Sequence, residues 1–415
     1  MTPNENAHPH LAATPWPAED GGPRRQQRPA GIPGPAARSA RLAAVRQAPI
    51  SVMAVLAPDD AVLVLRNTIG AEAVSWVESV HPESLEERRR SPELPLGPFW
   101  PGGLAVLADG AIIVVQGRYA ARLAPDLSVE TVRELPVEAP YNSFVVLADG
   151  SLATKDLQRP GGPSSRLSVL DPVTLEDLAP PQPIGEPSVA RISADGNDVV
   201  VVGVSTLRRL RWDPHAATVT PAFDLDRRYL VHDGQSYGWD PVVDDGAVWW
   251  MDNGDHTFQD QMTMLGSGVA PGPVRLWRAG LDGGAATSVE IAGLPGGAIT
   301  NPPVVDPERG LAVGYDSANG VLAAFSTEDL SPRWRSAVRT SQHLVLFPDT
   351  GELVVNDFDR GGGDALAVVD ITDGSVRARV DVQSAVQSVV FPAPGIRRDA
   401  YYVSLSTITR VVFGD

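Results

Sequence analysis

A short strand–turn–strand phrase recurs along most of this chain and limits the folds it can adopt. Residues 104–115 read LAVLADGAIIVV, and residues 144–154 read FVVLADGSLAT, so the two Asp-Gly turns are 40 positions apart. Each copy joins two apolar runs through a turn, as expected of a β-hairpin. Hairpins that recur at about 40–50 residues are typical of a β-propeller, in which every repeat forms one four-stranded blade. We therefore predict an all-β fold, a single β-propeller of antiparallel blades.

The number of blades follows from counting the repeats. The first strands of the repeats are expected to begin near Val52, Leu104, Phe144, Val189, Val242, Val304, Leu344 and Val389. The last repeat, from about 388 to 413, has room for only three strands, and an open blade would leave an unpaired edge. Either residues 43–50 supply the missing outer strand, or the ring has seven blades. We favour eight.

The first part of the chain differs in composition from the repeats. Residues 1–45 are rich in Pro, Ala, Gly and Arg and show no apolar periodicity, so we predict a disordered leader, followed by the propeller over 46–415. Arg24-Arg25 superficially matches a twin-arginine export signal, but no apolar segment follows it. No apolar run approaches the roughly 18 residues needed to span a bilayer. The prediction is a soluble, cytoplasmic protein.

Charge and cysteine content exclude several kinds of site. The chain has no cysteine, so it has neither disulfides nor thiolate–metal ligands. Its formal net charge of −17 argues against a nucleic-acid partner, because phosphate binding requires clustered cations. Of its 34 basic residues all but Lys155 are arginine, which raises the question of a special task for that amine.

Propeller geometry predicts where a site lies. Residues just before a first strand and just after a second strand surround one mouth of the central channel, together with the longer loops. The polar residues at these positions are Asn142, Asp240, Asn301 and His343 before first strands, and Gln116, Lys155, Asp156, Asp252, Asn253, Tyr315, Asp316, Asn356 and Asp357 after second strands. The long insertions 225–238, 252–272 and 357–364 lie on the same face. This loop-rich face is the candidate site, although Asn and Asp at strand ends also occur simply because they form turns.

A metal site is the first chemical hypothesis for this face. Asn142, Asp240 and Asn301 come from different blades, and calcium takes carboxylate and amide oxygens in flexible geometry. The alternative is that these residues only form turns.

Three residues are candidate catalysts. His343 is a candidate general base, with an ordinary structural histidine as the alternative. Lys155 is a candidate electrostatic group for an anionic substrate, or else a simple ion pair with Asp156. Asp240 is the second candidate base.

Further residues at the mouth are candidates for substrate binding, namely Asp156, Trp239, Tyr315, Asp316 and Asp357. The aromatic residues there, with Trp100 and Tyr141, either line a pocket for a flat or apolar ligand or plug the channel.

The repeat phrase, for example PGGLAVLADGAIIVV over 101–115, resembles the blades of the propeller group that includes NHL repeats, gluconolactonase, strictosidine synthase and virginiamycin B lyase. The resemblance covers about 100–391, and the whole body is similar to a bacterial propeller family to which no activity is assigned. In the gluconolactonase and strictosidine-synthase branches a divalent cation or an acidic residue stands at the inner-strand ends, which Asn142, Asp240 and Asn301 match. No counterpart of the glutamate that commonly completes such a site is found.

The sequence thus predicts a small-molecule enzyme, a cation-assisted hydrolase or lyase, with its site at the loop-rich mouth. The alternative is a non-catalytic propeller that binds a ligand or a protein partner. The expected cofactor is a divalent cation, calcium. Quinone, haem and nucleotide are not expected: residues 329–334 (DLSPRW) match a quinone-enzyme docking repeat only faintly, without an adjacent cysteine pair. A membrane partner is not expected.

Overall fold

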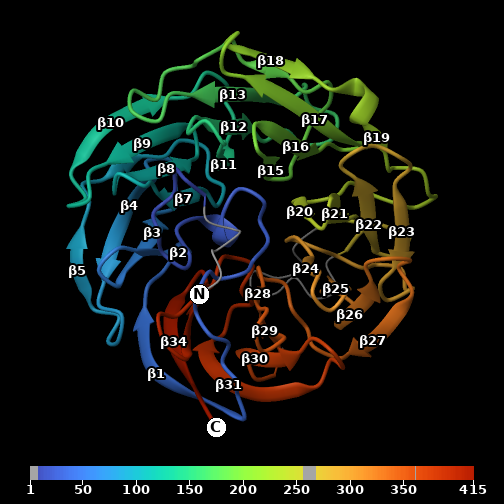
Figure 1. The fold of residues 1–415 in the computed structure, drawn as a ribbon. Coiled ribbons are helices and arrows are strands. Elements are labelled where there is room, and N and C mark those ends of the chain that lie inside the picture. Colours follow the sequence, from blue (N-terminus) through green and yellow to red (C-terminus); the bar gives the residue numbers. More distant parts are fainter. Residues whose placement is uncertain (1–7, 256–267, 360) are drawn as a thin grey trace.

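The fold is a closed ring of eight antiparallel sheets, or blades, around a central channel (Figure 1). It is known from a computed structural model, which describes residues 8–255, 268–359 and 361–415. The predicted eight-bladed propeller is confirmed.

The strands of each blade follow one another from the channel outward. Blades 1 and 2 contain β2 (Ser51–Ala57), β3 (Ala61–Asn67), β4 (Val74–Val80) and β5 (Glu87–Arg90), then β7 (Gly103–Val106), β8 (Ile112–Gln116), β9 (Tyr119–Leu123) and β10 (Val129–Glu134). Blades 3 and 4 contain β11 (Tyr141–Val146), β12 (Leu152–Asp156), β13 (Arg166–Leu170) and β14 (Gln182–Pro183), then β15 (Ile192–Asp195), β16 (Asp198–Val202), β17 (Thr206–Asp213) and β18 (Thr218–Pro221).

Blades 5 and 6 contain β20 (Val242–Asp244), β21 (Ala247–Met251), β22 (Arg275–Gly280) and β23 (Thr287–Glu290), then β24 (Val304–Asp306), β25 (Leu311–Asp316), β26 (Val321–Ser326) and β27 (Pro332–Ser336). Blade 7 contains β28 (Val345–Phe347), β29 (Glu352–Asn356), β30 (Asp364–Asp370) and β31 (Val376–Ser384), and blade 8 contains β32 (Ala393–Pro394), β33 (Asp399–Val403), β34 (Thr407–Gly414) and β1 (Ser39–Gln47). The short strands β6 (Leu94–Pro95) and β19 (Arg227–Arg228) pair with β4 and β17, and η1 (Glu19–Gly21) and η2 (Phe223–Leu225) are single 3₁₀ turns.

Burial within a blade explains the apolar runs of the sequence. All residues of β7 and β8 are buried, because both faces of these inner strands pack against neighbouring blades. The outer strand β10 alternates between exposed and half-buried residues. The turn between β7 and β8 requires a positive φ at Gly110 (88°), which glycine adopts without steric cost.

The ring closes by joining the two ends of the chain. β1 pairs antiparallel with β34, from Ser39 opposite Gly414 to Gln47 opposite Thr407. The N-terminal strand therefore supplies the outer strand that the last repeat lacks. Of the two alternatives, seven or eight blades, the structure therefore shows eight. The closing strand, 39–47, begins a few residues earlier than the predicted 43–50.

Residues 8–38, which we call the strap, cross the centre of the ring, and residues 34–38 then run outward past the hairpin of blade 7 to β1 (Figure 1). Strap carbonyls accept hydrogen bonds from the inner strands of blades 1, 2, 4, 5 and 7, for example Trp16 from Leu56 N–H (2.8 Å) and Arg24 from Val243 N–H (2.9 Å). Trp16 is 1% exposed and belongs to the core around blades 1, 2, 7 and 8.

The sequence predicts a disordered leader over residues 1–45, and the structure differs over the part that it describes. Residues 8–38 have almost no regular structure of their own. They are nevertheless held in place, because the inner strands offer unpaired N–H groups to which an extended segment can bind.

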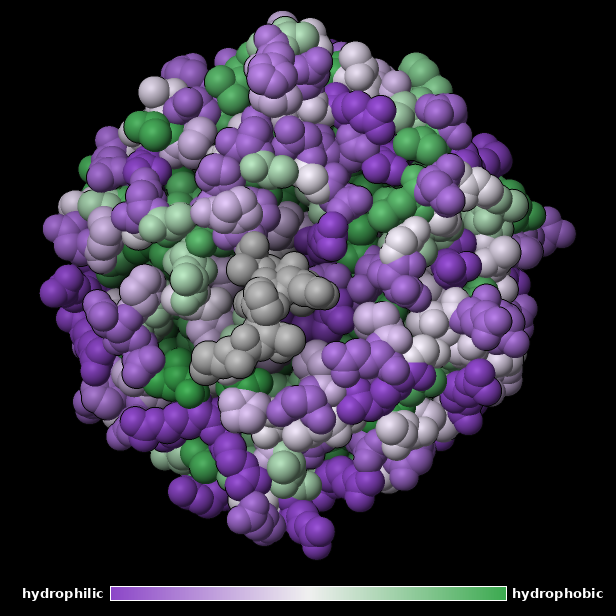
Figure 2. Space-filling model, in the orientation of Figure 1, coloured by the Kyte–Doolittle hydropathy of each residue, from purple (hydrophilic) through white to green (hydrophobic). Residues whose placement is uncertain are grey.

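On the face shown in Figure 2, apolar residues form only small separate patches among polar ones. No helix among the described residues is long and apolar enough to cross a membrane.

Candidate functional site

The ring brings the predicted site residues to one end of the channel, but the strap closes the channel below them. Lys155, Asp240 and His343 are at most 1% exposed. These three groups are therefore inside the protein, and His343 contacts Asp20 of the strap.

A cluster of buried charges joins the strap to the blades. Asp20 adopts a left-handed conformation (φ 54°), and the turn directs Glu19 and Asp20 into the channel. Arg25, also from the strap, forms ion pairs with both carboxylates and hydrogen-bonds to the Ile192 carbonyl at 2.6 Å. From blade 4, the Arg191 Nε lies 2.7 Å from a Glu19 oxygen.

The nearby cations oppose the effect of burial on the pKa values of Asp20 and Glu19. Burial by itself would raise the pKa of Asp20, but His343 and Arg25 outweigh it and hold this pKa below its usual value. Burial raises the pKa of Glu19, against the opposing effect of Arg25 and Arg191. The Glu19, Asp20 and Asp240 carboxylates are balanced by Arg25, Arg191 and the Lys155 ammonium.

His343 is bound by the strap and is closed to solvent. Its Nδ1 lies 2.8 Å from Asp20 Oδ1, and its ring stacks on Phe391 with 3.7 Å between the centroids. These contacts match the structural alternative given for this residue. A role as general base requires that the strap first move away.

Lys155 lies on β12, between blades 3 and 4. Its ammonium donates to the carbonyls of Ser188 (3.1 Å) and Asp156 (3.4 Å). Burial lowers its pKa to about 8, although the Asp156 and Asp240 carboxylates act in the opposite direction. The lone lysine is thus a buried cation held by backbone carbonyls.

This lowered pKa predicts a pH dependence of stability. Between pH 8 and 10.5 the unfolded chain keeps a proton on Lys155 that the folded protein has released. Raising the pH through this window therefore stabilises the fold, by up to roughly 3 kcal/mol. Below pH 8 both states are protonated and the term is constant.

The measurement is the free energy of unfolding in urea from pH 7.5 to 10.5 for the wild type and for Lys155→Met. The difference between the two proteins is expected to change with pH across the window. A difference that stays flat contradicts a lowered lysine pKa.

The three predicted metal ligands lie near the channel and all form hydrogen bonds to backbone groups. The Asn142 amide donates to the Val189 carbonyl (2.9 Å), and the Asn301 amide donates to the carbonyls of Ser341 (2.5 Å) and Val389 (3.4 Å). Asp240 Oδ1 accepts from the Arg191 N–H at 2.7 Å. Each of these contacts joins two blades.

This set of groups does not fit calcium. Among the three predicted ligands only Asp240 has a carboxylate, and Arg191 Nη1 already lies 3.9 Å from its Oδ2. The Lys155 ammonium also interacts electrostatically with this carboxylate. Calcium needs six to eight oxygens and no competing cations. Nowhere in the described part of the chain do three His, Cys, Asp or Glu side chains form a group that could hold a metal ion.

The aspartates predicted to bind substrate cap backbone groups at the ends of second strands. Asp156 Oδ1 accepts from the Arg166 N–H (2.5 Å), Asp316 Oδ1 from the Ala298 N–H (3.2 Å), and Asp357 Oδ1 from the Arg339 N–H (3.0 Å). They tie the loops of the channel mouth to the blades, as turn-forming residues do. Substrate binding by these carboxylates stays a prediction.

Most aromatic residues of this face fill space inside the ring. Tyr315 is fully buried and donates its hydroxyl to the Asn301 carbonyl at 3.0 Å. Trp239 is 5% exposed, and its indole N–H donates to the Gly254 carbonyl at 3.0 Å. Trp100 is the exception, because it remains half-buried. Its ring stacks on Trp239, with 6.1 Å between the centroids.

A pocket opens beside Trp100 on the loop-rich face. It has a volume of about 380 Å³, and apolar side chains of Pro98, Phe99, Pro140 and Leu157 line it together with the indole. Polar groups stand at its rim, among them Arg159, whose guanidinium carbon lies 5.8 Å from the centroid of the Trp100 ring. This pocket is of the size that holds a small ligand.

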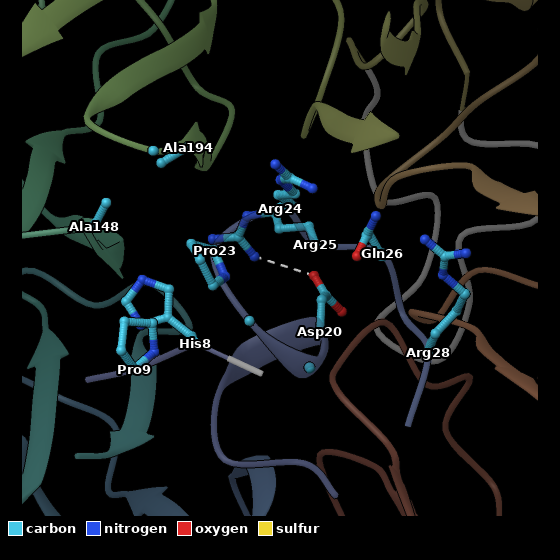
Figure 3. A pocket seen from close by; sticks show the side chains of 13 residues that line it. His8, Pro9, Asp20, Pro23, Arg24, Arg25, Gln26, Arg28, Ala148 and Ala194 are labelled. Carbon is cyan, nitrogen blue, oxygen red and sulfur yellow. Dashed lines mark hydrogen bonds and ion pairs between the residues drawn. The ribbon is translucent and has the colours of Figure 1, made fainter. Parts of the chain in front are cut away.

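A second pocket, of about 200 Å³, lies on the opposite face between the strap and the hairpins of blades 3 and 4 (Figure 3). Three strap arginines line it, but each is paired with an acid: Arg24 with Asp195 (2.5 Å), Arg25 with Glu19 and Asp20, and Arg28 with Asp244 (2.7 Å). The pocket therefore offers a ligand no unpaired arginine among the residues that the structure describes.

Sequence reasoning missed the strap residues that occupy the channel, namely Glu19, Asp20, Arg25 and Gln27, and their partner Arg191. One signal for them exists in the sequence. Trp16 lies between prolines in a segment otherwise rich in disorder-promoting residues, and disordered segments contain few aromatic side chains. The insertion 252–272 was assigned to the loop-rich face, and its residues 256–267 lie outside the described residues, as does Arg360 of 357–364.

Comparisons with known proteins bear on the fold. No protein-family model matches the chain, and no curated protein matches it. Among solved structures, BamB from Moraxella catarrhalis is similar, with 13% identity, a TM-score of 0.54, and coverage of 89% of this chain and 100% of BamB. The quinohemoprotein alcohol dehydrogenase from Comamonas testosteroni gives 10% identity, a TM-score of 0.67, and coverage of 98% and 81%.

A third similar structure is the dihydro-heme d1 dehydrogenase NirN in complex with DHE, with 16% identity, a TM-score of 0.51, and coverage of 81% of this chain and 68% of NirN. At these identities the likeness shows the propeller fold alone. The resemblance to the lactonase and lyase group of propellers stays a prediction.

Proposed function

We propose that this protein is a non-catalytic, ligand-binding propeller whose site is the pocket beside Trp100 on the loop-rich face. The observation that carries the proposal is the contrast between this open pocket and the closed channel. A flat apolar group fits between the prolines and the indole, since aromatic rings favour offset stacking and apolar walls.

The main competing function is the cation-assisted hydrolase or lyase that the sequence predicts. Enzymes share this fold, because two of the similar structures are named as dehydrogenases. Catalysis in the channel would need substrate to reach Lys155, Asp240 and His343, which are buried beneath ion-paired strap residues. The cytoplasmic location also stays a prediction.

Binding to a neutral flat probe, indole-3-acetamide, tests the proposal. Wild-type protein is expected to bind it measurably in saturation-transfer NMR. Trp100→Ala is expected to weaken binding about tenfold, because it loses an aromatic contact worth about 0.5–1.5 kcal/mol and also the apolar area that the ring buries.

The control variant is Phe223→Ala, which removes a 68% exposed aromatic side chain that is not part of the pocket. Equal binding by Trp100→Ala and wild type overturns the assignment of the site.

A further inference from the structure

The pocket beside Trp100 combines apolar walls with two charged residues, Arg159 and Glu138. The Arg159 side chain is exposed, and it forms no salt bridge with any residue that the structure describes. Arg122, Arg208 and Arg275 each pair with a carboxylate within 3.1 Å. Several exposed arginines, Arg333 among them, form no salt bridge with a described residue, and what distinguishes Arg159 is its place in the lining of an apolar pocket. A guanidinium without a carboxylate partner, next to an indole, is a ready site for a planar anion.

No side chain in the described part of the chain forms a salt bridge with Arg159, although the Glu138 carboxylate lines the same pocket. Gln158, beside it, donates its amide to Asp156 Oδ2 at 2.7 Å and is thereby turned to the blade. Glu138 also lines the pocket and is exposed, but no salt bridge joins it to Arg159. A ligand carboxylate can therefore take the position opposite the guanidinium.

We infer that the pocket selects a small molecule that carries a carboxylate next to a flat apolar ring. This inference rests on the proposed function and specifies its ligand class. The ring packs against Trp100, Pro98, Pro140 and Leu157, while the carboxylate pairs with Arg159 in a bidentate arrangement. The net charge of −17 repels an anion at long range. At about 0.1 M salt, however, charges more than about 10 Å away are largely screened, so the ion pair with Arg159 dominates the binding of a carboxylate.

The test compares two probes that differ only in charge, indole-3-acetate and indole-3-acetamide, with acetate as a carboxylate that has no ring. Wild-type protein is expected to bind indole-3-acetate roughly two- to fivefold more tightly than the amide in calorimetry, because solvent weakens an ion pair with an exposed guanidinium. Acetate alone is expected not to bind. Arg159→Gln is expected to make the two indole probes equal, without weakening the amide.

Arg333→Gln is the matched control, because it removes one exposed positive charge from an outer strand far from the pocket lining. It is expected to keep the wild-type preference for the acid over the amide. The same combination of indole and carboxylate occurs at a protein C-terminus that ends in tryptophan, so a peptide with a C-terminal tryptophan is tested as well. Tighter binding of this peptide than of indole-3-acetate overturns the inference of a small-molecule ligand.

The outcomes separate the two proposals. Equal affinity of the acid and the amide for wild type overturns the carboxylate inference and leaves a flat-ring site intact. Failure of both indole probes to bind wild type overturns the proposed function itself.

Discussion

Replacing Arg25 by methionine is expected to lower the free energy of unfolding by about 3–5 kcal/mol, because it removes the cation that two buried carboxylates share and leaves Glu19 with Arg191 and Asp20 with His343 alone. Arg25 is 1% exposed, and its guanidinium binds Glu19, Asp20, Ser143 and the Ile192 carbonyl. Urea denaturation followed by tryptophan fluorescence measures the change.

The preceding residue offers a matched control. The Arg24 side chain is 50% exposed and pairs with Asp195 at the surface. Arg24→Met is expected to cost at most about 1 kcal/mol, since exposed ion pairs contribute little. A similar loss for both variants means that the strap is not held by its buried charges.

Removing residues 1–47 is expected to abolish the cooperative folded state. The deletion takes away the strap, and it also takes away β1, so that β34 becomes an unpaired edge. The expected loss is comparable with the whole stability of an ordinary domain, about 5–15 kcal/mol.

A chain that begins at residue 39 separates the two contributions. It keeps β1 and loses the strap, and it is expected to retain a cooperative transition at a lower urea concentration than the wild type. Circular dichroism and analytical ultracentrifugation monitor both truncated chains. Coincident transitions for the two would show that β1 adds nothing to closure of the ring.

The repeats of the sequence predict the eight blades because each hairpin is encoded locally, by apolar runs and an Asp-Gly turn. The strap escapes the same reasoning, since its order depends on inner strands that lie far away in sequence. Gln27 shows why: its side chain accepts from the Leu344 N–H at 2.7 Å and donates to the Pro303 carbonyl at 2.8 Å, and no local pattern encodes either contact.

The three candidate catalytic residues, Lys155, Asp240 and His343, lie inside the ring, where solvent does not reach them. The common location of Asn142, Lys155 and Asp240 can be predicted from the order of the strands, because each residue stands at or next to the end of an inner strand of its blade. Their accessibility depends on what fills the channel, and His343 faces Asp20 of the strap. The exposure of Trp100, by contrast, follows from its place in the connection between blades 1 and 2.

The joining of β1 to β34 has a consequence for synthesis of the protein. Chains emerge from the ribosome with the N-terminal end first, so residues 39–47 are made long before the partner strand 407–414 exists. During that time the nascent chain carries an unpaired strand at its leading end. A chain without residues 407–414 therefore cannot close the ring through β1, however complete its other seven blades are.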